Sequence, residues 1–115
     1  MVQLSKVINC ERTDRPWGNY TVLQEGPNFK IKELIVFPNR CLSYQRHKFR
    51  GETWLVTEGR GTAIIDGEVY NLNTGDLLTV NSSNWHQLIN GTNGMLKIHE
   101  LQWGNHCIEE DIERK

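Results

Sequence analysis

Short runs in which apolar and polar residues alternate make up most of the chain, and turn-forming residues separate them. Alternation with a period of two is typical of a β-strand that buries one face. The runs lie at 20–23, 30–37, 53–57, 61–66, 76–80, 85–89 and 95–101. No segment has helical periodicity over three turns, although the charged residues 108–115 are compatible with a short helical tail. Many short, closely spaced strands predict an all-β sandwich or barrel.

Glycine, proline, asparagine and aspartate cluster between these runs. Asp66-Gly67 lies between Ile65 and Glu68, where a two-residue turn would join two strands. Aspartate and glycine both accept the positive φ that such a turn requires. We therefore expect a tight β-hairpin at this position.

Length and composition narrow the class of protein. A chain of 115 residues with 37% hydrophobic and 23% charged residues is expected to be one soluble domain, residues 1–115. Its net charge of −1 gives no basis for nucleic-acid binding, and no apolar run is long enough to span a membrane. Cys10, Cys41 and Cys107 do not form a disulfide framework, and no signal peptide is evident, so we expect a cytoplasmic protein.

Four residues are spaced in a way that folding alone does not require. They are Gln45, His47, Glu52 and His86. Gln45 and His47 are two residues apart and would share one face of a strand. Two imidazoles, a carboxylate and an amide oxygen are suitable ligands for one divalent metal ion, and zinc, manganese, cobalt, nickel and magnesium all remain open.

The segments around these residues resemble the two signature motifs of the cupins. Residues 39–59 contain Gln45, His47, Glu52 and Gly59 at the spacing of the first motif, with Gln45 in place of its first histidine. Residues 75–90 contain Gly75, His86 and Asn90 of the second motif. The resemblance implies a double-stranded β-helix, or jelly-roll barrel. Its core would span about residues 15–104, with an N-terminal arm and a short C-terminal tail.

A closer resemblance is to the isomerase domain of type II phosphomannose isomerases. It covers roughly residues 15–113 and rests on short stretches spread along the chain: Arg15-Pro16-Trp17-Gly18, Gln45-Arg46-His47, Arg50-x-Glu52-x-Trp54 and Glu100-Leu101-Gln102. It implies a metal-dependent isomerase that interconverts mannose 6-phosphate and fructose 6-phosphate through an enediolate, within GDP-mannose synthesis. It also implies a Gln-His-Glu-His metal set and a homodimer.

Further site residues follow from the same resemblance and from charge. Lys32, Arg50 and Glu100 are candidate catalytic residues, and Arg15, Trp17 and Gln102 are candidate substrate contacts. The cations would bind the phosphate. Glu100 and Gln102 share one face of the last strand, where they could accept a proton and contact a sugar hydroxyl. The acidic residues 109–111 are expected to be a solvated end.

Other functions remain open at this point. The family's tail continues into an Asp-x-Tyr-Gly-Arg motif that these 115 residues do not contain, which favours a non-catalytic metal-binding cupin that binds a sugar phosphate. His47, Glu52 and His86 also form the two-histidine, one-carboxylate set that holds iron in Fe(II) oxygenases. A nucleotide-sugar epimerase or ketoisomerase is possible on the same fold.

Overall fold

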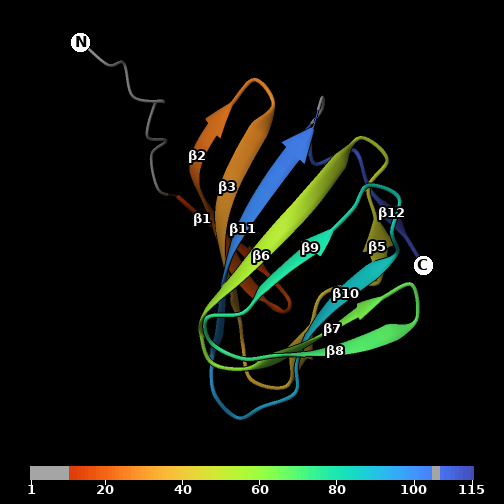
Figure 1. The fold of residues 1–115 in the computed structure, drawn as a ribbon. Helices are drawn as coiled ribbons and strands as arrows, with labels where there is room; N and C mark the ends of the chain where they lie inside the picture. Colours follow the sequence, from red (N-terminus) through yellow and green to blue (C-terminus); the bar gives the residue numbers. More distant parts are fainter. Residues whose placement is uncertain (1–10, 105–106) are drawn as a thin grey trace.

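The computed structural model describes residues 11–104 and 107–115, and those residues form β-strands and loops without a helix (Figure 1). Accordingly, no helix in this part of the chain is long and apolar enough to cross a membrane. One six-stranded antiparallel sheet has the order β1-β2-β3-β11-β6-β9. Its strands are β1 (Arg12–Arg15), β2 (Gly18–Gly26), β3 (Phe29–Val36), β11 (Leu96–Gly104), β6 (Arg50–Glu58) and β9 (Leu77–Val80).

The second sheet has the order β12-β5-β10-β7-β8, and β4 also pairs with β10. Its strands are β12 (Glu113–Arg114), β5 (Gln45–Arg46), β10 (His86–Asn90), β7 (Gly61–Ile65), β8 (Glu68–Leu72) and β4 (Arg40–Cys41). The chain crosses between the two sheets several times, so residues distant in sequence become neighbours. Two antiparallel sheets connected in this way form the all-β cupin barrel that the sequence predicted.

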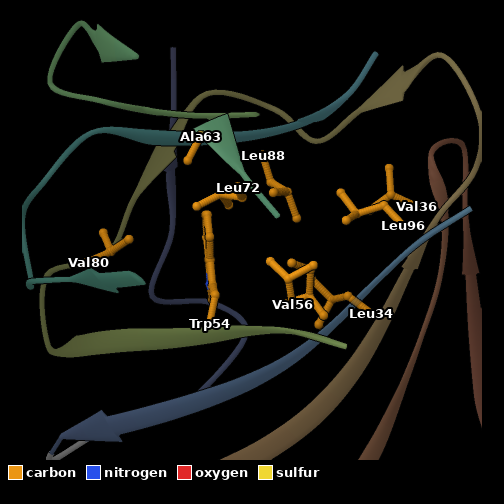
Figure 2. Packing of buried hydrophobic residues seen from close by; sticks show 10 residues of the cluster. Leu34, Val36, Trp54, Val56, Ala63, Leu72, Val80, Leu88 and Leu96 are labelled. Atoms are coloured by element: carbon orange, nitrogen blue, oxygen red, sulfur yellow. The ribbon is translucent and has the colours of Figure 1, made fainter. Parts of the chain in front are cut away.

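The hydrophobic core fills one part of the space between the sheets. Figure 2 shows the Trp54 ring beside Leu72 and Ala63, with Leu88 nearby. Trp54 is 2% exposed and Leu88 1% exposed. Burying such side chains is the main favourable contribution to folding. A cavity lined by both polar and apolar side chains forms the candidate site.

All seven runs of alternating residues form strands, and the Asp66-Gly67 hairpin is confirmed. Asp66 has φ 48° and Gly67 has φ 85°, as a two-residue turn of this kind requires. The expected helical tail is wrong, because Glu113 and Arg114 pair with β5 as strand β12. The Arg46 guanidinium donates to the Glu113 carboxylate at 2.9 Å, which holds the tail in an extended conformation. Cys10 lies outside the described residues.

Candidate metal centre

Three buried side chains from different parts of the chain meet between the sheets. Glu52 lies in β6, His86 begins β10, and His47 follows directly after β5. Their ligand atoms all lie within 4.8 Å of one another. Gln45 lies in β5, where its Cα is paired with that of His86. The antiparallel pairing of β5 with β10 therefore unites the two sequence motifs.

The Glu52 carboxylate is at the centre of this cluster. One of its oxygens is 3.3 Å from His47 Nε2, and the other is 3.3 Å from His86 Nε2. The Arg50 guanidinium lies 3.1 Å from the first oxygen and 3.1 Å from His47 Nε2. The predicted set of His47, Glu52 and His86 is thus assembled, and Arg50 supplies positive charge beside it.

Backbone carbonyls fix the orientation of both imidazoles. His47 Nδ1 lies 2.6 Å from the carbonyl oxygen of Asp111, and His86 Nδ1 lies 3.0 Å from that of Asn84. A carbonyl only accepts hydrogen bonds, so each Nδ1 donates, and each Nε2 is left facing the cluster. Carbonyl-anchored imidazoles that present Nε2 are the usual arrangement of histidine metal ligands.

Charge within the cluster separates the pKa values of its members. Burial opposes ionisation of Glu52, but the neighbouring His86, His47 and Arg50 outweigh it and lower the pKa of Glu52 to about 2. Burial also lowers the pKa of His47. The pKa of His86 is raised, because hydrogen bonding and attraction to Glu52 exceed the effect of burial. Glu52 is therefore an anion at neutral pH.

This donor set fits a divalent metal ion. Two inward-facing imidazole nitrogens and one ionised carboxylate are ligands that zinc, manganese, cobalt and nickel accept. The three side chains are nearly fully buried, with exposed fractions of 2% for His47, 2% for Glu52 and 3% for His86. The cluster can therefore hold a metal ion. A buried carboxylate such as Glu52 needs positive charge beside it, and a metal ion would add to the charge that Arg50 supplies.

A cavity adjoins the cluster and gathers the other candidate residues. Ten residues were singled out from the sequence, and all except His47 line the cavity: Arg15, Trp17, Lys32, Gln45, Arg50, Glu52, His86, Glu100 and Gln102. The side chains of Tyr20, Ser43, Trp54 and Glu109 also contribute. The residues named here come from seven strands and from the loops beside them, and together they build one concave site.

A second carboxyl group, Glu100, lies in the same cavity. It is in β11, which runs between β3 and β6 and is therefore an interior strand. The Trp54 indole donates to one of its oxygens at 3.1 Å, and the Gln102 amide donates to the other at 2.7 Å. Burial, followed by repulsion from Glu52, raises the pKa of Glu100 to about 7. Glu100 can therefore gain or lose a proton near neutral pH.

Comparison with known proteins assigns the chain to a family. A family model described as "Mannose-6-phosphate isomerase C-terminal" matches residues 4–115. The chain belongs to this family. The alginate biosynthesis protein AlgA of Pseudomonas fluorescens is 36% identical over 106 residues, covering 92% of this chain and 22% of that protein. The mannose-1-phosphate guanylyltransferase of Escherichia coli K12 is 31% identical, covering 87% of this chain and 21% of that protein. The chain thus spans about a fifth of the length of these relatives.

The fold agrees with solved structures. A Klebsiella pneumoniae protein with a double-stranded β-helix domain superimposes with a TM-score of 0.78, covering 99% of this chain and 97% of that one, at 15% identity. A cupin fold for this member of the mannose-6-phosphate isomerase C-terminal family is therefore established.

The C-terminal segment of this family member contributes to the site, although Glu109 and Glu110 are exposed, as expected of a solvated end. The Asp111 carboxylate accepts hydrogen bonds from the backbone N–H groups of Lys48 and Phe49, both at 2.9 Å. Together with its carbonyl contact to His47, it fixes the loop that carries this ligand. Glu109 forms an ion pair with Lys32. Sequence alone gave no sign of these contacts, because an acidic run near a chain end is usually solvated.

Proposed function

We propose that this domain is a metal-dependent aldose–ketose isomerase acting on mannose 6-phosphate and fructose 6-phosphate. One observation carries the proposal: a cluster suited to a divalent metal opens onto a cavity that also contains the buried carboxyl group of Glu100 and the cation of Lys32. The family assignment supports the same chemistry. His47, Glu52 and His86 would hold the metal, with Gln45 as a fourth ligand.

The reaction moves a proton between two neighbouring carbons. A base removes the proton from C2 of the open-chain aldose, the C–H electrons form a C1–C2 double bond, and O1 takes up a proton. The proton from the base then returns to C1 while the O2 hydroxyl loses its proton, which leaves the ketose. A bound divalent ion would stabilise the negative charge that develops on the two oxygens.

Glu100 is the proposed proton carrier between the two carbons. A base is most effective when its pKa is close to the working pH, and Glu100 titrates at about 7. The Trp54 and Gln102 donors hold both oxygens of its carboxylate, and Gln102 Oε1 is buried without a partner among the described residues. A sugar hydroxyl in the cavity would satisfy that oxygen.

The first test is turnover in D2O with the metal-reconstituted protein and mannose 6-phosphate, followed by proton NMR. We expect fructose 6-phosphate to form, with deuterium at C1 in those turnovers in which the proton on Glu100 exchanges with D2O before it returns. Glu100→Gln should reduce the rate by at least about a hundredfold, as loss of a general base does. Glu52→Ala should abolish both metal binding and turnover.

Glu33→Gln is the matched control. Glu33 lies one residue from Lys32 on the opposite face of β3, where it contacts His99 at 3.1 Å, so turnover should be unchanged. Absence of product with each of several metals, in protein that binds those metals, would contradict the isomerase. Saturable binding of mannose 6-phosphate without turnover would then favour a sugar-phosphate-binding cupin, and oxygen consumption with bound iron would favour an oxygenase.

A further inference from the structure

Two lysines of β3 hold a carboxylate that comes from outside the sheets. Lys32 Nζ lies 2.5 Å from Glu109 Oε1, and Lys30 Nζ lies 3.7 Å from the same oxygen. Lys30 and Lys32 are two residues apart, so they point to the same side of the strand. Lys32 and Glu109 both line the cavity beside the metal cluster.

The cation of Lys32 is fixed, while its anionic partner is half in solvent. The side chain of Lys32 is 6% exposed, and that of Glu109 is 51% exposed. The Tyr20 ring lies under Lys32 Nζ at 4.2 Å from its centroid and restricts where the ammonium group can lie. A buried ammonium group is unfavourable without an anion beside it. In this structure Glu109 provides that anion.

We propose that Lys30 and Lys32 form the binding subsite for the phosphate group of the ligand, and that the Glu109 carboxylate occupies this subsite until the ligand displaces it. The inference rests on the proposed function only for the choice of phosphate as the anion. Lysine binds carboxylate and phosphate oxygens in the same way, as a point charge with N–H donors. A phosphate bound by Lys32 would place the rest of the ligand along the cavity toward Glu100, Glu52 and His86, which line the same space.

Exchange of Glu109 for phosphate does not require the tail to detach. Asp111 is held separately, by the backbone N–H groups of Lys48 and Phe49. The backbone N–H of Lys115 also donates to the Tyr44 carbonyl at 2.9 Å. Only the Glu109 side chain must rotate outward, and its half-exposed position leaves solvent on one side for that movement.

Calorimetric titration with inorganic phosphate tests this directly. Glu109→Gln keeps the size of the side chain and removes its charge, so phosphate no longer competes with a resident anion. We expect its dissociation constant for phosphate to fall by up to about fivefold, the upper end of the range of a partly exposed ion pair. Glu109→Ala should give the same change, and Lys32→Met should abolish the binding.

Glu110→Gln is the matched control, because it changes the net charge by the same amount and Glu110 does not line the cavity. Equal affinity gains in the Glu109 and Glu110 variants would overturn the inference, since net charge alone would then explain them. Weaker phosphate binding by Glu109→Gln would overturn it as well.

The titration needs no turnover, so it separates the subsite from the proposed function. A failed isomerase assay together with the expected gain in phosphate affinity would contradict the isomerase and support the subsite. Turnover without that gain would reject the subsite and leave the isomerase.

Discussion

Two carboxyl groups in the same cavity have pKa values shifted in opposite directions. Both are buried, which alone would raise both values. Glu52 is surrounded by His86, His47 and Arg50, and its hydrogen bond with His86, together with electrostatic attraction to these groups, outweighs burial. Glu100 accepts hydrogen bonds from the neutral N–H groups of Trp54 and Gln102 and is repelled by Glu52. The two groups are therefore suited to different roles, an anionic metal ligand and a proton carrier.

The raised pKa of Glu100 predicts a pH-dependent cost in stability. Between pH 4.5 and about 7, an unfolded Glu100 has lost its proton while the folded protein retains it. The folded state then binds more protons than the unfolded state. The contribution of Glu100 to the free energy of unfolding therefore falls as pH rises through that window. Glu100→Gln should remove this decline, which we expect to be of the order of a few kcal/mol. Urea unfolding at several pH values, with a chelator present, measures it.

The control for that measurement is again Glu33→Gln, on the solvent face of the neighbouring strand. Its pH profile should follow that of the unchanged protein. If Glu100→Gln also retains the full decline, the carboxyl group of Glu100 is not the one that titrates in this window.

At the scale of elements, the hairpin between β7 and β8 orients His86, one of the candidate metal ligands. The Asp66 carboxylate accepts hydrogen bonds from the Trp85 backbone N–H at 3.0 Å and from the Asn84 amide at 2.7 Å. The Asn84 carbonyl in turn accepts the hydrogen bond from His86. A residue that serves as a turn former in the sequence thus also fixes the loop that leads to the metal centre.

We therefore expect Asp66→Ala to weaken metal binding. Loss of a group that orients a ligand commonly lowers metal affinity by about 10- to 100-fold. Competition with a chromophoric chelator measures the affinity. Gly67→Ala is the matched variant, because Gly67 has φ 85° with nothing within 4 Å of an added Cβ. It should lower stability by about 1 kcal/mol through backbone strain while leaving metal affinity unchanged. Equal affinity losses in both variants would mean that general loosening of the turn, not the Asp66 carboxylate, is responsible.

At the scale of the whole molecule, apolar side chains are exposed on the edge strand of each sheet. Leu77 in β9 is 68% exposed, and Val69 in β8 is 63% exposed. Uncovered edge strands favour pairing between molecules. The homodimer predicted from the sequence stays a prediction, and these two edges are where we expect contact.

Sedimentation analysis tests the dimer. The chain has a mass of 13.4 kDa, and a homodimer would have twice that mass. Leu77→Lys and Val69→Lys would each place a charge on one edge, and the variant at the contacting edge should sediment as a monomer. A monomer at all accessible concentrations for the unchanged chain would refute the dimer.

Much of the fold and most of the metal centre could be predicted from the sequence, because both depend on local patterns. Alternation of apolar and polar residues determines which side of a strand is buried, so the seven principal strands were predictable. The spacing of His47, Glu52 and His86 within two motifs was sufficient to predict that they would meet. The short strands β4 and β12 were not predicted, because two residues carry no periodicity, and a strand at Gln45 was expected only from its spacing to His47.

Only the tertiary structure decided how the C-terminal segment completes the site. By itself, the sequence predicted an all-β domain from its alternating pattern, and its resemblance to known motifs predicted the metal-ligand set and the nearby cations. The partners of Glu109 and Asp111 depend on where the tail crosses the barrel, and they lie more than sixty positions away in sequence. The pKa of Glu100 likewise depends on its burial beside Glu52, which arises only when β11 packs between β3 and β6. These contacts and this pKa shift depend on which residues are close together in the folded protein, and the spacing of residues along the chain does not show that.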